Sequence, residues 1–531
     1  MKTLLACGVA IICPAVLAQP HDHEHSHGTV DFHTSCSAEA QGHFDTGLAL
    51  LHHMMYEQAE TSFAAAGASD PECAIAHWGI AMTVIHPLWG ERPSDANLAK
   101  GSAALARARS IPEATPRETA YVAATEPFFA NAADTPYPAQ LVAFEAGFRG
   151  LHEAYPDDID AAAFFALSHL AIASRSDQTL ANQRAAGALL EELHHRAPDH
   201  PGLYHYTIHA YDNPVLADRA EAVAAGYDRL APNVPHALHM PSHIFVRQGA
   251  WPETIRWNER SAAAALEQPV GGATSMHFAH ALDYLVYAHL QRGDDDAARG
   301  VVERLMEVAD LAPALAAAYA LAATPARYAL EREAWEEAAA LQPRAGAPQP
   351  WERFGGAESI SWFARGLGAA RAGDDAGAGA AIAELDRIHS ALSAEPYWAT
   401  LTDAHRKSVA AWRAFSADDR ERALALMTEA ADLEDSVDKH PVTPGAVLPA
   451  RELLGDMLME LDRPADARAG YEAALTVSPN RLRSLRGAAL AAAEAGDPTG
   501  ARRYAEQLFA ILADGANRDG LDSVRDLTSS R

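Results

Sequence analysis

Two histidine pairs in the sequence have the spacing at which side chains share one face of a helix. The segment YHYTIHAYDNP contains His205 and His209, and PHALHMPSHIF contains His239 and His243. Side chains four residues apart on a helix have Cβ atoms ~5–6 Å apart, so two imidazoles can bind one metal ion. The second pair follows the first after 34 residues. We therefore expect these four histidines to be the principal ligands of a transition metal.

Further polar residues near the two pairs complete the candidate site. Nine of the 26 histidines fall within residues 200–289. His236 and His280 are expected to complete the metal shell or to orient its members, with Asp283 as a secondary candidate. If the site is catalytic, Tyr287 is a candidate proton donor and Asp283 a candidate partner. The alternatives are a histidine-rich groove that binds a peptide or small ligand, and a purely structural use of the imidazoles.

One proline bears directly on the second pair. Pro241 lies between His239 and His243 and either kinks the helix or begins it. If Pro241 begins the helix, His239 precedes that helix and the argument from a shared face fails for this pair.

Imidazole ligands narrow the choice of metal without settling it. Cu and Zn fit such a site best, and Fe also accepts imidazole nitrogen. Zn would suit hydrolysis, whereas Cu or Fe would suit oxidation, with water or dioxygen bound at an open coordination position. The sequence has no phosphate-binding glycine loop, nucleophile elbow, Cys-x-x-Cys or His-Glu-x-x-His motif. A non-catalytic scaffold that binds a peptide or protein partner is therefore the second hypothesis.

The composition indicates a globular and strongly acidic chain. Its 531 residues include 42 Lys plus Arg and 71 Asp plus Glu, which gives a formal net charge of −29. This charge argues against nucleic acid or an anionic membrane surface as the main partner. No stretch beyond the N-terminal region reaches the ~20 apolar residues that a membrane span needs. The length exceeds that of one ordinary core and favours several units or a solenoid.

The first residues predict export. Residues 1–18 combine an early lysine, an apolar run and a small-residue cleavage signal, which is typical of a secretory signal peptide. We therefore expect a periplasmic or secreted protein. The mature chain would keep Cys36 and Cys73, which are expected to form one disulfide in an oxidising compartment. Two buried free thiols are the alternative.

A histidine-rich tail, residues 19–38, is expected to follow the signal peptide. Its QPHDHEHSHG stretch alternates histidine with acidic and small residues. This composition is typical of a flexible tract that collects Zn or Cu ions, although a solvated tail with no selected role explains it equally well. The tail histidines are His21, His23, His25 and His27.

Helices in a 34-residue repeat must position these residues. Amphipathic patterns rich in Ala, Leu and Glu dominate, and no sustained strand alternation occurs. The unit LPARELLGDMLMELDRPADARAGYEAALTVSPN, which starts at Leu448, resembles the tetratricopeptide repeat in its small residues and its final proline. Similar frames start at Ala40, Pro201, Pro235, Ala279 and Leu482. The resemblance implies an all-α fold, a tetratricopeptide-like α-solenoid that forms a right-handed superhelix of helix–turn–helix repeats.

The repeat frames also predict the groove and the domain boundaries. In the tetratricopeptide family, positions 5 and 9 of each repeat face the concave groove, and both histidine pairs take these positions in their frames. The proline- and glycine-rich segment 341–358 predicts a linker between an N-terminal array with a histidine-lined groove, 39–340, and a C-terminal array, 359–531. Taken whole, stretches such as PHALHMPSHIFVRQGAW and KHPVTPGAVLPARELLGDML resemble exported bacterial tetratricopeptide proteins without an assigned activity.

Overall fold

Helices make up the fold throughout the described part of the chain. The structure is a computed structural model that describes residues 27–516 and 518–529. Within these residues there is no β-strand, only isolated bridges such as Val270 with Ala273. The predicted all-α fold is therefore confirmed. The predicted signal peptide, as well as His21, His23 and His25, lies outside the described residues.

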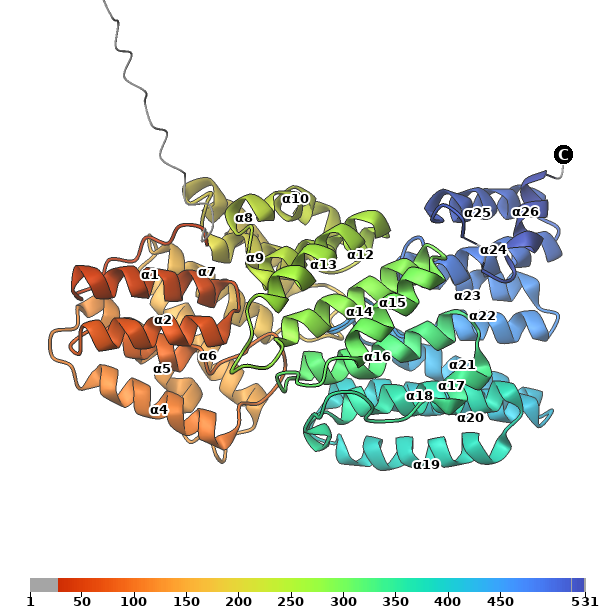
Figure 1. Cartoon of the computed structure of the whole chain (residues 1–531), viewed down its shortest axis with the longest axis horizontal. Coiled ribbons are helices and arrows are strands. Elements are labelled where there is room, and N and C mark those ends of the chain that lie inside the picture. Colours follow the sequence, from red (N-terminus) through yellow and green to blue (C-terminus); the bar gives the residue numbers. More distant parts are fainter. Residues whose placement is uncertain (1–26, 517, 530–531) are drawn as a thin grey trace, which may run out of the picture.

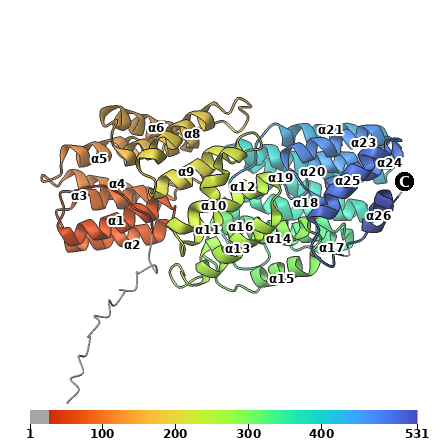
Figure 2. The same cartoon turned by 90° about the horizontal axis from the view of Figure 1, so that it is seen from above.

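The helices follow one another as antiparallel pairs with short connections (Figures 1 and 2). The first half of the chain forms α1 (Ala38–His52), α2 (Tyr56–Ser69), α3 (Ala74–Met82), α4 (Asp95–Arg109), α5 (Pro116–Phe129), α6 (Tyr137–Ala154), α7 (Ile159–Ala171), α8 (Ala181–Arg196), α9 (Pro201–Tyr211), α10 (Glu221–Leu230), α11 (Pro235–His239), α12 (Pro241–Gln248) and α13 (Trp251–Leu266). The second half forms α14 (Met276–Gln291), α15 (Asp295–Met306), α16 (Leu315–Glu331), α17 (Trp335–Ala340), α18 (Gly355–Ala372), α19 (Asp375–Ala391), α20 (Pro396–Ser416), α21 (Arg420–Asp435), α22 (Ala450–Glu460), α23 (Pro464–Val477), α24 (Leu482–Glu494), α25 (Pro498–Ile511) and α26 (Leu521–Ser529).

Local sequence signals begin many of these helices. Ser37 accepts a hydrogen bond from the Ala40 amide at the start of α1, and Thr115 and Glu118 form a reciprocal capping box at the start of α5. Proline occupies the first turn of α9 and α23, where its missing N–H costs nothing. These caps explain why short polar segments suffice to separate so many helices.

A glycine packed against an aromatic ring joins the two helices of the recognised repeats. A Cβ atom on Gly47 of α1 would lie 2.8 Å from the Phe63 ring of α2. The repeat that starts at Leu448 uses the same device, because a Cβ on Gly455 of α22 would lie 2.7 Å from the Tyr471 ring of α23. Both pairs occur where the repeat frames place a small residue opposite an aromatic one, so the tetratricopeptide-like packing is confirmed there.

The central helices α9–α16 lie between the N-terminal helices and the C-terminal ones in both views (Figures 1 and 2). The C-terminal helices also contact the central ones directly. The Trp251 indole N–H donates to the Asn480 carbonyl (2.9 Å), and the Ala513 amide donates to the Arg292 carbonyl (2.9 Å). The chain therefore folds back on itself, which a simple row of repeats does not do.

The segment predicted as a linker is irregular over most of its length. Residues 341–350 contain no helix, a short 3₁₀ turn follows at Trp351–Arg353, and α18 begins at Gly355. Helix α18 packs directly on α16 and α17. A division into two arrays stays a prediction.

Two further findings bear on the sequence analysis. Cys36 and Cys73 form a disulfide that ties the segment before α1 to the start of α3. Among the described residues, none of the helices combines the length and the apolar character that crossing a bilayer requires.

Candidate metal centre

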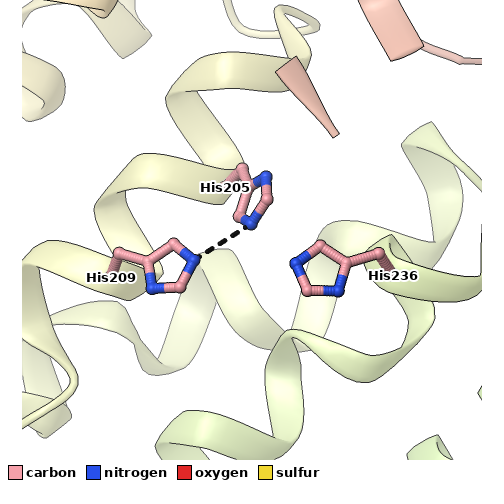
Figure 3. A group of neighbouring side chains, drawn as sticks. All are labelled: His205, His209 and His236. Atoms are coloured by element: carbon pink, nitrogen blue, oxygen red, sulfur yellow. Dashed lines mark hydrogen bonds between the residues drawn. The ribbon is translucent and has the colours of Figure 1, made fainter. Parts of the chain in front are cut away.

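A first group of three histidines lies between α9 and α11. His205 and His209 project from α9, and His236 projects from α11, with their ring nitrogens turned toward one another (Figure 3). The Nε2 atoms of His205 and His209 are 3.1 Å apart. Two nitrogens at ~2.0–2.1 Å from a shared ion and at about a right angle would be separated by about 3 Å. The group, called triad 1 below, could therefore hold one metal ion.

A second group, triad 2, consists of His239, His243 and His280. His280 projects from α14, and its ring centroid lies 4.2 Å from that of His239. The Nε2 atoms of His239 and His243 are 3.0 Å apart. In each triad, one nitrogen of each of the three rings lies within 4.8 Å of the others. The structure thus brings together all six histidines that the sequence nominates, as two sets of three.

Pro241 begins α12, as one of the two sequence hypotheses stated, and His239 ends the preceding α11. The pair nevertheless converges, because Met240 between the two helices keeps right-handed helical angles (φ −52°, ψ −39°). Ser242 donates its hydroxyl hydrogen to the His239 carbonyl (2.6 Å), which replaces the helical amide donor at this break. The helix break therefore preserves the spacing of one turn between the two imidazoles.

The partners of the Nδ1 atoms fix the tautomers in triad 2. Asn258 donates its side-chain N–H to the Thr254 carbonyl (2.8 Å), so its Oδ1 atom is the acceptor that faces His239 Nδ1 at 2.7 Å. His243 Nδ1 lies 2.8 Å from a carboxylate oxygen of Asp212, which also accepts. A neutral imidazole carries one N–H. Both Nε2 atoms therefore present lone pairs to each other at 3.0 Å.

In triad 1, the tautomer of one ring is fixed in the same way. His205 Nδ1 lies 2.7 Å from the carbonyl oxygen of His52, which can only accept a hydrogen bond. His205 Nε2 thus carries a lone pair that is directed at His209. Both ring nitrogens of His236 are buried without a hydrogen-bond partner. A buried imidazole with no partner costs free energy unless something else occupies its nitrogens.

The two triads are contiguous. Ring centroids of His209 and His243 are 5.6 Å apart, and those of His236 and His239 are 5.9 Å apart, so no residue separates the triads at these points. The ring centroid of His277, a residue that the sequence did not single out, lies 5.0 Å from that of His236. Both ring nitrogens of His277 are buried without a hydrogen-bond partner. The Trp89 ring packs against both His236 and His280, with ring centroids 5.9 and 5.7 Å apart.

The cluster favours neutral imidazoles, the form that binds metals. Burial lowers the pKa of His205 to about 3 and that of His277 to about 4. Burial and the neighbouring imidazoles lower the pKa of the other members well below the usual value for histidine, namely His209, His236, His239 and His280. Burial also lowers the pKa of His243, although Asp212 opposes this shift. The nitrogens are therefore available as lone pairs near neutral pH.

A third histidine group, His52, Asp160 and His200, is a hydrogen-bonded network. His52 and His200 both donate from Nε2 to Asp160 Oδ1, at 2.9 and 3.1 Å. The Tyr206 hydroxyl lies 3.0 Å from His52 Nδ1 and can donate to it. Burial lowers the pKa of His52 to about 4, and hydrogen bonds from the two histidines hold the pKa of Asp160 down despite burial. The network is joined to triad 1, because His205 Nδ1 donates a hydrogen bond to the His52 carbonyl.

A charged network lies behind His243. Asp212 accepts hydrogen bonds from Arg247 Nε (2.9 Å) and Lys439 Nζ (2.7 Å) in addition to that from His243. Burial opposes ionisation of Asp212, but the charges of Lys439 and Arg247 outweigh it and hold its pKa well below the usual value. Burial lowers the pKa of Lys439 to about 8.

Lys439 belongs to the loop 436–449 between α21 and α22, which runs beside the triads. Its neighbour Asp438 accepts from Arg247 (2.9 Å), and the Tyr284 hydroxyl donates to the Thr443 carbonyl (3.1 Å). The Tyr284 ring lies 4.5 Å from that of His239. The loop therefore closes one side of the histidine cluster.

A cavity of about 1120 Å³ reaches the cluster at His209. Asp212, Lys439, His440, Tyr397 and Trp398 also line this cavity. His209 is half-buried, whereas the other five histidines of the triads are at most 2 % exposed. A small molecule in this cavity would therefore meet the cluster through His209.

The two catalytic candidates from the sequence are held by arginines. Asp283 accepts from Arg327 Nε at 3.0 Å, with both side chains fully buried, and burial raises the pKa of Asp283. The Tyr287 hydroxyl lies 3.1 Å from Arg481 Nη1. The first contact joins two central helices, and the second joins α14 to the segment before α24. Neither candidate belongs to a triad. His27, the one tail histidine that the structure describes, offers its carbonyl to His53 Nε2 (3.0 Å).

Sequence reasoning missed several residues that orient the triads. Asp212 stands only three residues after His209, and its place in the quoted motif is the one signal available. Asn258 lies on α13 and Lys439 lies some two hundred residues away in the chain, so no spacing rule connects them with the histidines.

No protein-family model matches this chain, and no curated protein sequence matches it. Among solved structures, the human IFIT1 dimer with m7Gppp-AAAA has 10 % sequence identity and a TM-score of 0.35, covering 88 % of this chain and 94 % of that one. The APC/C hetero-tetramer Cut9–Hcn1 has 12 % identity and a TM-score of 0.29, covering 93 % and 99 %. Likeness at this level says nothing about function, and the fold described above rests on the chain's own helices.

Proposed function

We propose that this protein binds transition-metal ions through the imidazoles of triad 1 and triad 2. The observation that carries the proposal is the pair of opposed lone pairs on His239 and His243. Asn258 and Asp212 engage both Nδ1 atoms, and the two Nε2 atoms lie 3.0 Å apart. Two lone pairs at this distance repel each other unless a cation lies between them.

A metal ion fits this role better than a shared proton. Burial lowers the pKa of both His239 and His243, so protonating either ring in this position is costly. A shared proton would also satisfy only two nitrogens, whereas His280 adds a third at the same place. Three converging imidazoles, two of which have partners on Nδ1, are typical of a metal shell with its orienting residues.

The His52–Asp160–His200 network shows the contrast within the same molecule. There, both Nε2 atoms point at a carboxylate oxygen, which accepts their hydrogens. Each donor has an acceptor, and the group needs no ion. In the two triads, the converging atoms are imidazole nitrogens without any carboxylate oxygen among them. The two kinds of cluster therefore support different roles.

The site supports metal-dependent chemistry better than peptide binding. A scaffold that binds a peptide in its groove needs an open row of side chains, but five of the six histidines are buried and the loop 436–449 closes one side. Three ligands per ion leave a coordination position for water or dioxygen. The cavity at His209 supplies a route for a small substrate. We place the activity in the class of metal-dependent oxidation, with hydrolysis as the alternative if the ion is zinc.

We also propose that the protein works in the periplasm or outside the cell. The Cys36–Cys73 disulfide supports this compartment, because disulfides persist in oxidising surroundings. Fractionation of cells that express the full chain tests the proposal, and recovery of the protein only in the cytoplasm would contradict it.

Metal analysis tests the proposed site. The full chain is purified without chelators, incubated with Cu or Zn, freed of excess ions and analysed for its metal content. We expect at least about one tightly bound ion per chain, and less than about 0.2 in a His205→Ala, His239→Ala double variant.

His405→Ala is the matched control. His405 is a buried histidine that stacks on Phe363, away from the triads, and its loss should leave the metal content unchanged. Far-UV circular dichroism establishes that all variants are folded. A wild-type metal content below about 0.2 per chain after reconstitution would contradict the proposed function.

A further inference from the structure

The two triads are close enough to act as one centre. Their rings approach to 5.6 Å between His209 and His243 and to 5.9 Å between His236 and His239. Each triad has three nitrogens, and no histidine is needed in both. Ions bound in the two triads would therefore occupy adjoining positions, which is what a two-metal site requires.

The charge of the ligand shell selects among metals. All six ligands are neutral imidazoles, and no carboxylate oxygen belongs to either triad. The nearest carboxylate in the hydrogen-bond network, Asp212, is already paired with Lys439 and Arg247. The cost of moving an ion from water into a buried site rises with the square of its charge. Two divalent ions would bring four positive charges, whereas two Cu(I) ions would bring two.

The type of ligand atom also favours Cu(I). Pairs of divalent ions, zinc included, usually rely on carboxylate oxygens, which share and neutralise their charge. Cu(I) is satisfied by three nitrogen ligands, and copper also heads the affinity order of divalent metals for such sites. We propose that triad 1 and triad 2 together hold one dinuclear copper centre whose reduced form reacts with dioxygen. This inference rests on the proposed function.

The reaction follows from the pairing of two one-electron metals. Each Cu(I) gives one electron and becomes Cu(II). One dioxygen molecule accepts both electrons and takes one proton from each of two water molecules, so that it leaves as hydrogen peroxide with its O–O bond intact. The two hydroxide ions that remain offset the two positive charges that the copper ions gain. The cavity at His209 gives dioxygen and water a path to the centre. A single copper can deliver only one electron and would release superoxide, so a superoxide trap present during the reaction distinguishes isolated ions from a pair.

Anaerobic loading with Cu(I) tests the inference. The full-length apoprotein is titrated with Cu(I), freed of excess copper and mixed with a known amount of dioxygen. We expect about two copper ions per chain and about one dioxygen consumed for every two copper ions. The oxidised protein should give little electron paramagnetic resonance signal, because the two neighbouring Cu(II) spins pair.

Variants that remove one triad separate the possible outcomes. His209→Ala alters the half-buried ligand of triad 1, and His280→Ala alters triad 2. Each should retain about one copper per chain, show the resonance signal of an isolated Cu(II) and lose the two-electron reaction. The control His405→Ala should behave like the wild type.

The possible failures are distinct. A wild-type chain that binds neither copper nor zinc contradicts both the proposed function and the dinuclear centre. A wild-type chain with one copper, or with two coppers that give the full signal of isolated Cu(II), contradicts the dinuclear centre and leaves the proposed metal site standing.

Discussion

Hydrogen bonds on the far side of each ring decide what the imidazoles can do. Asn258 is the clearest example, because its amide group has one possible orientation. Its N–H donates to the Thr254 carbonyl, and its oxygen therefore accepts from His239 Nδ1. This arrangement holds His239 in the tautomer whose Nε2 lone pair points into triad 2. Asn258 itself is fully buried.

Substitution of Asn258 by alanine should weaken metal binding without removing a ligand. The His239 ring would lose the acceptor that fixes its tautomer, and such losses typically cost ~10–100-fold in metal affinity. Competition with a chromophoric chelator measures the change. Asn97→Ala, at an exposed position of α4, is the control and should bind metal as the wild type does. Equal affinity in the two variants would show that Asn258 does not orient the site.

Spacing in the sequence predicts the candidate ligands but not the residues that orient them. The spacing of four residues reflects one helical turn, and the offset of 34 is the length of the two-helix repeat; together they nominated His205, His209, His239 and His243. The orienting residues follow no such period. Asn258 lies on the second helix of its repeat and Lys439 in a distant loop, so only the folded chain brings them to the ligands.

Between elements, small residues set how closely the helices of a repeat approach. Gly47 and Gly79 both lie against the Phe63 ring, and Gly455 and Gly487 both lie against the Tyr471 ring. Gly47 and Phe63 are 16 positions apart in the sequence, as are Gly455 and Tyr471. Gly101 also lies against a ring, that of Phe129, but these two residues are 28 positions apart. The longer interval explains why none of the predicted 34-residue frames starts between residues 95 and 165.

Two glycines of α1 offer a matched test of this packing. A Cβ on Gly47 would lie 2.8 Å from Phe63, whereas a Cβ on Gly42 would meet no atom within 4 Å. Gly47→Ala should therefore destabilise the protein by ~1–3 kcal/mol through overpacking. Gly42→Ala should stabilise it by ~0.5–1 kcal/mol, since alanine favours a helix. Urea unfolding measures both, and a stabilising Gly47→Ala would contradict the close approach of α1 and α2.

The disulfide strengthens the same N-terminal elements. Cys36 and Cys73 are 37 residues apart, and a loop of this length corresponds to ~3–4 kcal/mol of stabilisation in the chain-entropy account. A Cys36→Ala, Cys73→Ala double variant should lose about this free energy of unfolding without leaving an unpaired thiol. Reducing the wild-type protein should lower its stability similarly and leave the double variant unaffected. No effect of reductant on the wild type would mean that the bond is absent.

Across the whole molecule, the C-terminal helices bind the central ones through a buried arginine. Arg481 contacts Glu331 at 2.7 Å and Glu452 at 3.1 Å, and all three side chains are fully buried. Its Nη1 also lies 3.1 Å from the Tyr287 hydroxyl. The resemblance to a repeat solenoid predicted contacts between neighbouring repeats only. This closure could not be foreseen from the sequence, because it depends on the accumulated curvature of many repeats.

The closure predicts how the molecule unfolds. In the wild type, contacts between α14 and α24 should couple the central and C-terminal helices, so that far-UV circular dichroism and tryptophan fluorescence report one coincident transition in urea. Trp251 donates to the Asn480 carbonyl at this junction, which makes fluorescence sensitive to its opening. Arg481→Met should leave Glu331 buried without its charge partner and cost ~3–5 kcal/mol.

The two signals should then separate in Arg481→Met, with the fluorescence change at the lower urea concentration, because the junction opens before the remaining repeats unfold. Arg502→Met is the matched control, since Arg502 forms only an exposed pair with Glu506 on α25 and should contribute less than about 1 kcal/mol. Coincident transitions in Arg481→Met at the midpoint of Arg502→Met would show that the repeats, not the closure, hold the molecule together.

Because Tyr287 and the loop 436–449 lie on the same side as the triads, loss of the closure should also weaken copper binding. Titration of both variants with copper measures this loss of affinity.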